Sequence, residues 1–222
     1  MNNPLQGVLG HLELLIETSV EARPLRRDLR RIYHEADRAA KIVRNLLIFT
    51  GSQRMTRHRL RLDRVLARAL ASRAASLRRH GIDVSRHVAD DVPRVSGDVL
   101  LLQQALLNVL INAEHAIVSR GGPGRISTTV CAINGGDTVR LVIEDSGPGI
   151  PPDVLPRIFD PFFTTKEVGE GTGLGLAITY GILQEHGGTI HAGNRPEGGA
   201  RFVIELPALR DAAKSEQSDK VR

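Results

Sequence analysis

The sequence predicts an α+β chain in which a helical hairpin, paired into a dimeric four-helix bundle, precedes an α/β sandwich domain with a mixed sheet. Apolar residues recur every three to four positions through the first fifty residues, which is the spacing of a helix face. Strand-like and helix-like segments then follow in mixed order, which favours a sandwich over a doubly wound sheet. Of the 222 residues, 41% are hydrophobic, so the chain can bury a core.

Residues 1–53 are predicted to form a dimerization hairpin. Its first helix places Leu5, Val8, Leu9, Leu12 and Ile16 on one face, and its second carries a heptad seam through residues 25–46. Pro4 and Pro24 each suit the first turn of a helix. Two helices cannot bury both apolar faces alone, so we expect two copies to pair into a four-helix bundle. A monomeric hairpin packed on the rest of the chain is the alternative.

The remaining chain is predicted to be one domain at residues 54–207, with a polar, disordered tail at 208–222. Strands are expected at 57–62, 82–88, 125–133 and 137–144, where apolar residues alternate. Helices are expected at 66–79 and 99–118, and Gly81 is suited to end the first of them.

The charge distribution argues against a nucleic-acid-binding protein. Residues 1–90 carry a net charge of +9, whereas residues 91–222 carry −4, so no uniform basic surface is expected. The arginine-rich stretch 52–68 lacks the interleaved aromatic residues that stack on bases. We interpret it as a solvated face, with contact to an acidic partner as the alternative.

Composition also bears on location and cofactors. A single cysteine excludes an internal disulfide framework and a cysteine-based zinc cluster. No segment is long and apolar enough for a transmembrane helix, and no signal peptide is visible. We therefore expect a cytoplasmic chain without membrane contact of its own, although a parent protein could be anchored.

A polar stripe crosses the apolar helix expected at 99–118. Asn108, Asn112 and His115 share one face, since they are spaced at i, i+4 and i+7. Burying an unpaired amide costs about 1–3 kcal/mol, so the stripe predicts a polar cleft. There an amide oxygen could bind Mg²⁺ together with phosphate groups. An internal hydrogen-bond network is the alternative.

A carboxylate ends the strand expected at 137–144. Asp145 is followed by Ser146-Gly147-Pro148-Gly149-Ile150, and glycines allow close approach of the backbone to a ligand. The carboxylate could accept a hydrogen bond from the exocyclic amine of adenine. Guanine has a carbonyl at that edge, so the site would prefer ATP. A plain turn is the alternative.

Glycines and phenylalanines cluster beyond this point. Twelve of the 22 glycines lie between residues 147 and 199, and Phe159, Phe162 and Phe163 fall within five positions. The segment 171–176, GTGLGL, is predicted to open a helix that runs to about His186. Glycines at a helix start leave backbone N–H groups to bind phosphate. The segment matches neither the P-loop nor the dinucleotide fingerprint. The polar stretch 167–170 could serve as a lid.

The ordered motifs NVLIN, DSGPGI, FDPFF and GTGLGL resemble the ATP-binding domain of sensor histidine kinases, which are related to DNA gyrase and MutL ATPases. The FFTTK and GTGLGLA segments are similar to the nitrogen-regulatory subgroup. The resemblance covers about residues 1–207. It implies a two-component kinase that transfers the γ-phosphoryl group of ATP to a histidine, for relay to an aspartate of a response regulator receiver domain.

The resemblance also implies a role for each matching residue. Asn112 would bind Mg²⁺, His115 would approach the phosphates, and Asp145 would hold the adenine amine. Further nucleotide contacts are implied for Gly147, Gly149, Ile150, Phe159, Thr164, Thr165, Lys166, Gly171, Thr172, Gly173, Leu174, Gly175 and Leu176. Asn108 and Lys166 are implied to assist catalysis. Gyrase-type ATPases have a glutamate base where this chain has Asn108, so rapid ATP hydrolysis is not expected.

The phosphoacceptor motif of the family, His-Glu-x-Asn-Asn-Pro-Leu, matches only from Met1 to Leu5. Its histidine would lie just before Met1, so we expect that this chain alone does not phosphorylate itself. His11 and His34 match nothing in the motif. Two other classes stay open: a dimeric nucleotide-sensing module without transfer activity, and a hydrolytic ATPase related to MutL.

Overall fold

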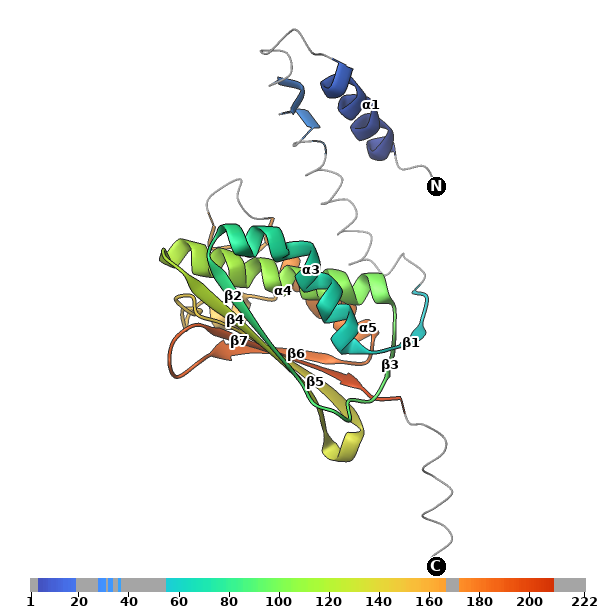
Figure 1. The fold of residues 1–222 in the computed structure, drawn as a ribbon, viewed down its shortest axis with the longest axis vertical. Coiled ribbons are helices and arrows are strands. Elements are labelled where there is room, and N and C mark those ends of the chain that lie inside the picture. The colour runs from blue at the N-terminus through green and yellow to red at the C-terminus, as the bar shows by residue number, and fades with distance from the viewer. Residues whose placement is uncertain are drawn as a thin grey trace, which may run out of the picture. The chain divides into compact units, whose positions relative to one another are not determined.

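The computed structural model describes residues 4–18, 55–166 and 172–209, together with positions 28–30, 32, 33 and 36. The chain divides into two compact units, residues 1–53 and 54–222. Figure 1 traces the chain from the first unit to the second.

In the first unit, helix α1 (Pro4–Thr18) begins at the predicted proline. Leu9 and Leu12 are buried, whereas several other apolar side chains of this unit are about half exposed or more: Val8 49%, Leu14 61%, Leu15 48% and Ile32 53%. The Tyr33 hydroxyl donates a hydrogen bond to Glu13 Oε1 at 2.7 Å. Most of the predicted second helix, with its heptad seam, lies outside the described residues.

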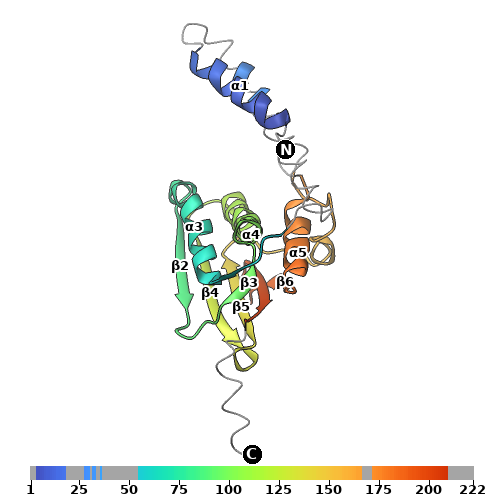
Figure 2. The same ribbon diagram turned by 90° about the vertical axis from the view of Figure 1, so that its right-hand side faces the viewer.

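The second unit is a two-layer α/β sandwich, which confirms the predicted fold class. Five strands form a mixed sheet in the order β2-β4-β5-β7-β6, with β2 and β4 parallel and the other neighbours antiparallel. Helices α3, α4 and α5 lie side by side on one face of this sheet (Figures 1 and 2). A separate antiparallel pair joins β1 to β3.

The helices are α3 (Leu62–Arg79), α4 (Val99–Arg120) and α5 (Gly175–Glu185). The strands are β1 (His58–Leu60), β2 (Ile82–Val88), β3 (Val95–Gly97), β4 (Gly124–Ile133), β5 (Thr138–Asp145), β6 (Thr189–Asn194) and β7 (Ala200–Pro207). Among the described residues, no helix is both long and apolar enough to cross a membrane.

The core lies between α4 and the sheet. Fully buried side chains include Leu102, Leu106, Leu110 and Ile117 from α4, and Ile126, Leu141, Ile143 and Ile204 from the strands. Burial of each such side chain contributes about 1.5–3 kcal/mol before conformational entropy is counted. The central helix is therefore held firmly against the sheet, and its polar stripe is held with it.

A buried carboxylate joins α3 to α4. Glu114 on α4 is 1% exposed and accepts hydrogen bonds from Arg73 Nη2 at 2.6 Å and from the Ser76 hydroxyl at 2.6 Å. Its Oε1 also lies 3.0 Å from His80 Nδ1. Burial alone would raise the pKa of Glu114, but the Ser76, Arg73 and His80 hydrogen bonds together lower it. The carboxylate therefore stays charged.

A second polar junction joins the start of α4 to the end of α5. Asp98 Oδ1 accepts the N–H groups of Leu100 and Leu101, which caps α4. Asp98 Oδ2 accepts the Thr56 N–H at 3.1 Å, and the Asp98 N–H donates to Nε2 of buried His186 at 3.0 Å. The other ring nitrogen of His186 lies 2.6 Å from the carbonyl of Ile182. Burial lowers the pKa of His186, and the ring is neutral because Nε2 must accept.

The starts of two helices differ from those predicted by several residues. Helix α3 begins at Leu62 rather than 66, because Leu62, Val65 and Leu66 already form its buried face. Helix α5 begins at Gly175 rather than within 171–174, because Gly173 has a φ of +65° and is not helical. Strand β7 ends at Pro207, Ala208 forms an isolated antiparallel bridge with Val95, and residues 210–222 of the predicted tail lie outside the described residues.

Candidate functional site

The predicted site residues come from four segments of the second unit. They are the middle of α4, the loop after β5, the segment 159–166 and the start of α5. Gly171 and the predicted lid at 167–170 lie outside the described residues.

Asp145 ends β5 and is 2% exposed. Its Oδ1 accepts the N–H of Gly147 at 2.8 Å and the N–H of Ala200 at 3.2 Å. Within the described residues, Oδ2 has no hydrogen-bond donor. Burial raises the pKa of Asp145, and the two N–H groups and Arg195 counteract only part of that rise. One carboxylate oxygen thus fixes the side chain and the other can accept a hydrogen bond from a ligand.

The glycines after Asp145 are required by close packing. A Cβ on Gly147 would stand 2.8 Å from Ala116 Cβ on α4, so the loop can lie against that helix only without a side chain. Gly149 has a φ of +83°, and a Cβ there would stand 2.9 Å from Asn194 Oδ1. The loop after β5 is therefore fixed to α4 on one side and to β6 on the other.

Three residues of this loop's surroundings were not predicted. Asn194 accepts the Ile150 N–H and donates to the Ile150 carbonyl, both at 2.7 Å, so it clamps that residue at both polar groups. Arg195 Nη1 donates to the Asp145 carbonyl at 3.2 Å. A side chain on Gly199 would collide with the same carbonyl. These residues follow Asp145 by about fifty positions, and only the sheet pairing brings them close.

The polar stripe of α4 faces α5 and the segment 159–166. Asn108 Nδ2 donates to the Gly175 carbonyl at 2.8 Å and to the Thr179 hydroxyl at 3.3 Å. Asn112 is half-buried and makes no side-chain hydrogen bond within the described residues. His115 is exposed, and its Nδ1 contacts Lys166 Nζ. Asn108 thus has a positioning contact, whereas the Asn112 amide can bind a ligand.

Residues 157–166 pack on the start of α5. The ring of Phe159 lies 5.9 Å from that of Tyr180, centroid to centroid. Phe162 has a φ of +65°, and a Cβ on Gly173 would stand 2.7 Å from Phe162 Cα. The guanidinium of Arg157 lies 4.5 Å from the centre of the Phe163 ring. The Phe162 backbone therefore lies directly against Gly173, and Phe159 packs on Tyr180 of α5.

Within the described residues, no hydrogen-bond partner is found for the first backbone N–H groups of α5. Its first residue is Gly175, and the preceding residue, Leu174, provides no side-chain cap. The first N–H groups of a helix lack partners within the helix and favour anions. Thr172 and Thr164 point their hydroxyls back at the N–H groups of Leu174 and Lys166, at 3.4 and 3.2 Å. Leu176 is half-buried, and Thr165 is exposed without a hydrogen bond among the described residues.

The combined geometry fits an anionic ligand that carries, at its other end, a ring with a hydrogen-bond donor, as a nucleobase does. A buried acceptor lies at Asp145, and the amide of Asn112, the His115–Lys166 pair and the helix start lie along α4 and α5. A lone amide oxygen suits Mg²⁺ only when a ligand supplies further oxygens, as phosphates do. The residues present therefore fit Mg²⁺ held jointly with a phosphorylated ligand.

Two family models match the chain. One, described as histidine kinase-, DNA gyrase B- and HSP90-like ATPase, covers residues 97–210. The other, described as His Kinase A (phospho-acceptor) domain, covers residues 1–53.

Among curated proteins, the sensor kinase CckA of Brucella abortus is 34% identical over 98% of this chain and 24% of its own length. The sensory histidine kinase/phosphatase NtrB of Rhizobium meliloti is 33% identical over 98% of this chain and 58% of its own length. The chain therefore spans about a quarter to three fifths of these relatives.

Among solved structures, full-length ShkA in complex with AMPPNP has a TM-score of 0.78 and 30% identity, over 94% of this chain and 44% of its own. The histidine kinase ThkA in complex with the response regulator TrrA has a TM-score of 0.65 and 27% identity, over 92% of this chain and 58% of its own.

Proposed function

This chain belongs to the family of histidine kinase-, DNA gyrase B- and HSP90-like ATPases, and from this premise we propose that it acts as the ATP-binding catalytic core of a two-component sensor histidine kinase. Nucleotide binding by the ATPase-type domain agrees with the AMPPNP complex of the similar protein ShkA.

The observation that supports an adenine nucleotide most directly is the state of Asp145. Its Oδ1 is taken by two backbone N–H groups, so the carboxylate cannot rotate away, and its Oδ2 remains an acceptor. The exocyclic amine of adenine donates a hydrogen bond to such an acceptor, whereas the carbonyl of guanine at the same edge has no hydrogen to donate to Oδ2. Binding guanine would leave a buried acceptor unpaired, which costs about 1–3 kcal/mol.

The rest of the nucleotide is assigned along α4 and α5. The N–H groups at the start of α5 would bind the phosphates, with Lys166 and His115 adding donors. Asn112 would hold Mg²⁺ by its amide oxygen, and the ion would neutralise phosphate charge during transfer. Gly173 and Gly175 keep this surface free of side chains, so the phosphates can approach the backbone closely.

The reaction we propose is in-line phosphoryl transfer to a histidine nitrogen. An imidazole nitrogen forms the new bond to the γ-phosphorus as the bond to the bridging oxygen breaks, and ADP leaves. The contribution of this chain is to position ATP and to stabilise the charge on the transferred group. The acceptor is supplied by a hairpin that carries the His-Glu pair of the family motif.

Hydrolysis in the manner of MutL is the second candidate, and Asn108 argues against it. An amide has no useful basicity, and the amide nitrogen of Asn108 is engaged by the Gly175 carbonyl and Thr179. No carboxylate takes that place on the stripe of α4, so the chain lacks a base to activate water there.

The proposed partners are a second copy of the chain and a response regulator. The half-exposed apolar side chains on α1 would be covered by pairing of two hairpins. The complex of the similar kinase ThkA with a response regulator supports a receiver domain as the acceptor for relay.

Calorimetric titration of the chain with Mg·ATP and Mg·GTP tests the nucleotide assignment. We expect ATP to bind at least tenfold more tightly than GTP, because one unpaired buried acceptor accounts for about that ratio. Equal affinities for ATP and GTP would show that Asp145 does not bind the base. Absence of binding to either nucleotide would contradict the proposed function as a whole.

A further inference from the structure

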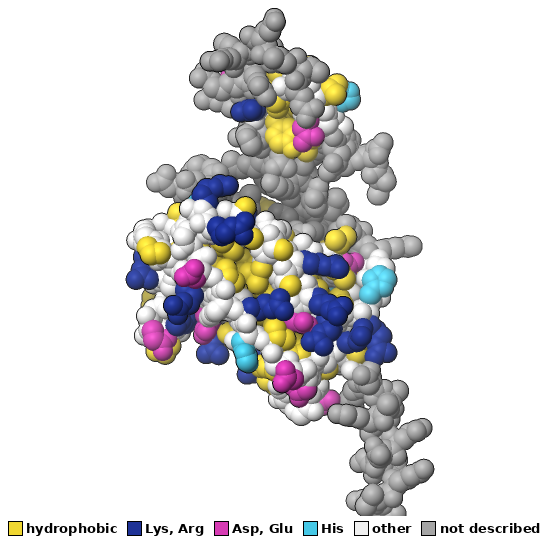
Figure 3. Space-filling view, viewed as in Figure 1, with side chains coloured by type: hydrophobic (Ala, Val, Ile, Leu, Met, Phe, Trp, Pro, Cys, Tyr) yellow, Lys and Arg dark blue, Asp and Glu magenta, His cyan; other side chains and the backbone are white. Residues whose placement is uncertain are grey.

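A cavity lined by five arginines lies at the β1 end of α3. We call it the arginine pocket: it has a volume of about 150 Å³ and is lined by Arg59, Leu60, Arg61, Arg64, Val65, Arg68, Arg94 and Val99. The arginines come from β1 and its following residue, from the first two turns of α3, and from the loop before β3. Figure 3 shows the corresponding concentration of Lys and Arg side chains on this part of the domain.

The charge of the pocket is largely uncompensated. Arg61 is paired with Asp63 at 2.9 Å, and Arg59 has an interaction of its own. Arg64, Arg68 and Arg94 have no ion pair and no side-chain hydrogen bond within the described residues. Three exposed arginines thus line one cavity, and each keeps all of its guanidinium donors for a ligand.

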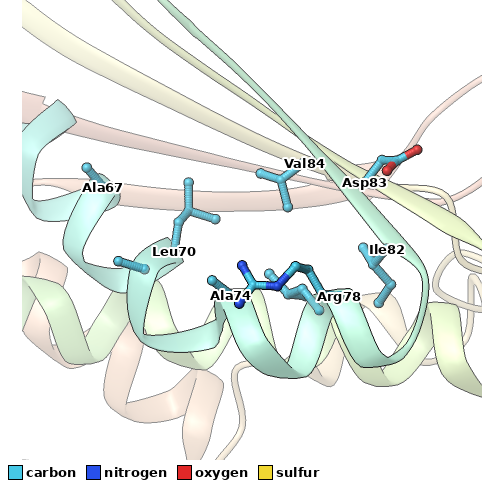
Figure 4. Close-up of a pocket in the computed structure, with 9 residues that line it drawn as sticks. Ala67, Leu70, Ala74, Arg78, Ile82, Asp83 and Val84 are labelled. Carbon is cyan, nitrogen blue, oxygen red and sulfur yellow. The ribbon is translucent and has the colours of Figure 1, made fainter.

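The neighbouring groove on the same helix has a different character. It lies between α3 and β2 and is lined by Ala67, Leu70, Ala71, Ala74, Leu77, Arg78, Ile82, Asp83 and Val84. In Figure 4 its aliphatic side chains face one another across the groove, with Arg78 and Asp83 as the charged members. Helix α3 therefore contributes two unpaired arginines, Arg64 and Arg68, to the arginine pocket, and a mainly apolar surface to the groove beside it.

The number of arginines indicates the class of anion. One guanidinium fork already satisfies a carboxylate, which has two oxygens and one charge. A phosphate monoester has three terminal oxygens and a charge of about −1.5 to −2, so it can engage several guanidinium groups at once. The apolar side chains of Leu60, Val65 and Val99 would contact the carbon part of such a ligand.

We propose that the arginine pocket is a second binding site of this chain, which takes the phosphate group of a small organic phosphate. The site is separate from the nucleotide site, since Val99 precedes Asn112 by 13 residues of α4, or about 20 Å at 1.5 Å per residue. None of the residues assigned to ATP lines it.

The test uses the full chain saturated with AMPPNP, so that the nucleotide site is filled. Phenyl phosphate is the probe, because it joins a phosphate monoester to a small apolar group, and benzoate is its carboxylate counterpart. Amide NMR shifts locate binding and titration gives the affinity. We expect shifts confined to residues 59–68 and 94–99, and benzoate binding about tenfold weaker or more.

Variants of the lining arginines complete the test. Arg64→Ala and Arg94→Ala lie on different segments, and each is expected to weaken phenyl phosphate binding about tenfold, as for loss of one charge-assisted hydrogen bond. Arg79→Ala is the matched control, because Arg79 is an exposed arginine of the same helix outside the pocket. The Arg79→Ala variant should bind phenyl phosphate with the same affinity as the wild-type chain.

Three results would overturn the proposal. Equal weakening by Arg79→Ala would show general attraction to positive charge, and equal binding of benzoate would remove the preference for phosphate. Binding to vesicles of phosphatidylglycerol without binding of phenyl phosphate would indicate a membrane surface instead. Because AMPPNP occupancy is measured in the same sample, failure of this site and failure of the nucleotide site are distinguishable.

Discussion

At the scale of single residues, Asp145 is an acidic side chain in a buried place where its charged form is disfavoured. The side chain is 2% exposed and burial raises its pKa. For an acid whose folded pKa is raised, the folded state binds protons more tightly than the unfolded state. Its contribution to stability is therefore lost as pH rises through the interval between the two values. At neutral pH the carboxylate destabilises the fold, which is expected of a group retained for binding.

Asp145→Asn should separate stability from binding. The Asn oxygen can still accept from Gly147 and Ala200, and the burial penalty of a charge disappears, so the melting temperature should stay equal or rise. The new NH₂ group would face the adenine amine, and ATP affinity should fall about ten- to hundredfold. Calorimetry of both properties checks this, with exposed Asp153→Asn as the control. Unchanged ATP affinity would contradict the role of Asp145.

Gly173 and Gly175 should respond differently to the same small side chain. Gly173→Ala places a Cβ at a φ of +65° and against the Phe162 backbone, so we expect a loss of at least about 1–2 kcal/mol in unfolding free energy. In Gly175→Ala the new Cβ contacts only the side chain of Asn108, with Cγ nearest at 3.7 Å, which is an ordinary contact, and a helix favours Ala over Gly. Urea unfolding of the pair measures the difference. Equal losses would mean that Gly173 is not held against Phe162.

The sequence could indicate candidate site residues whose chemistry lies in consecutive positions, such as Asp145 with its glycines. It could not predict Asn194 or Gly199, because their roles arise from contacts with residues about fifty positions away. Asn108 shows a related limit: its polarity on an apolar helix predicted a cleft, but only the packing of α4 on α5 reveals its hydrogen bond to Gly175.

At the scale of elements, the junction around His186 fixes α4 relative to α5. The ring accepts from the Asp98 N–H, so protonation of Nε2 breaks that bond. The folded pKa lies below the unfolded value of about 6.5. Between these two pKa values the unfolded state binds more protons than the folded state. The contribution of His186 to stability is therefore fully present above a pH of about 6.5 and falls as the pH drops through that interval.

His186→Gln should therefore flatten the dependence of unfolding free energy on pH below about 6.5. The variant loses some stability at neutral pH because the buried contacts of the ring change. The difference between wild type and variant should shrink as pH falls toward 5, as measured by urea unfolding across that range. His191→Gln, at an exposed histidine of β6, should leave the wild-type slope unchanged. A parallel slope in His186→Gln would contradict this account.

Elements with a long periodic pattern were the most predictable, and strands β3, β6 and β7 were not predicted. The apolar helix α4 and the alternating strands β4 and β5 appear close to their expected bounds. Strand β3 has three residues, too few to show alternation, and it exists because β1 pairs with it. Helix α5 begins later than predicted because Gly173 has a positive φ, which an α-helix does not accommodate.

At the scale of the whole molecule, the hairpin is expected to hold two copies together. Val8 and Leu15 are seven residues apart on α1 and are 49% and 48% exposed, so a partner helix could cover both. The double variant Val8→Lys, Leu15→Lys should shift the chain from dimer to monomer in sedimentation equilibrium. His11→Lys, an exposed change on the same helix, should not. A wild-type chain that is monomeric at micromolar concentration would contradict the prediction.

The central claim is that ATP bound between α4, α5 and the loop after β5 donates its γ-phosphoryl group to a histidine. The most direct measurement incubates the full chain with γ-³²P-labelled Mg·ATP and a hairpin partner that carries the His-Glu motif. We expect acid-labile label on that partner, and we expect the label to be lost with Asp145→Asn in this chain. ATP binding without label would leave a nucleotide-sensing module, and sustained phosphate release without label would indicate a hydrolase; either result would contradict the account.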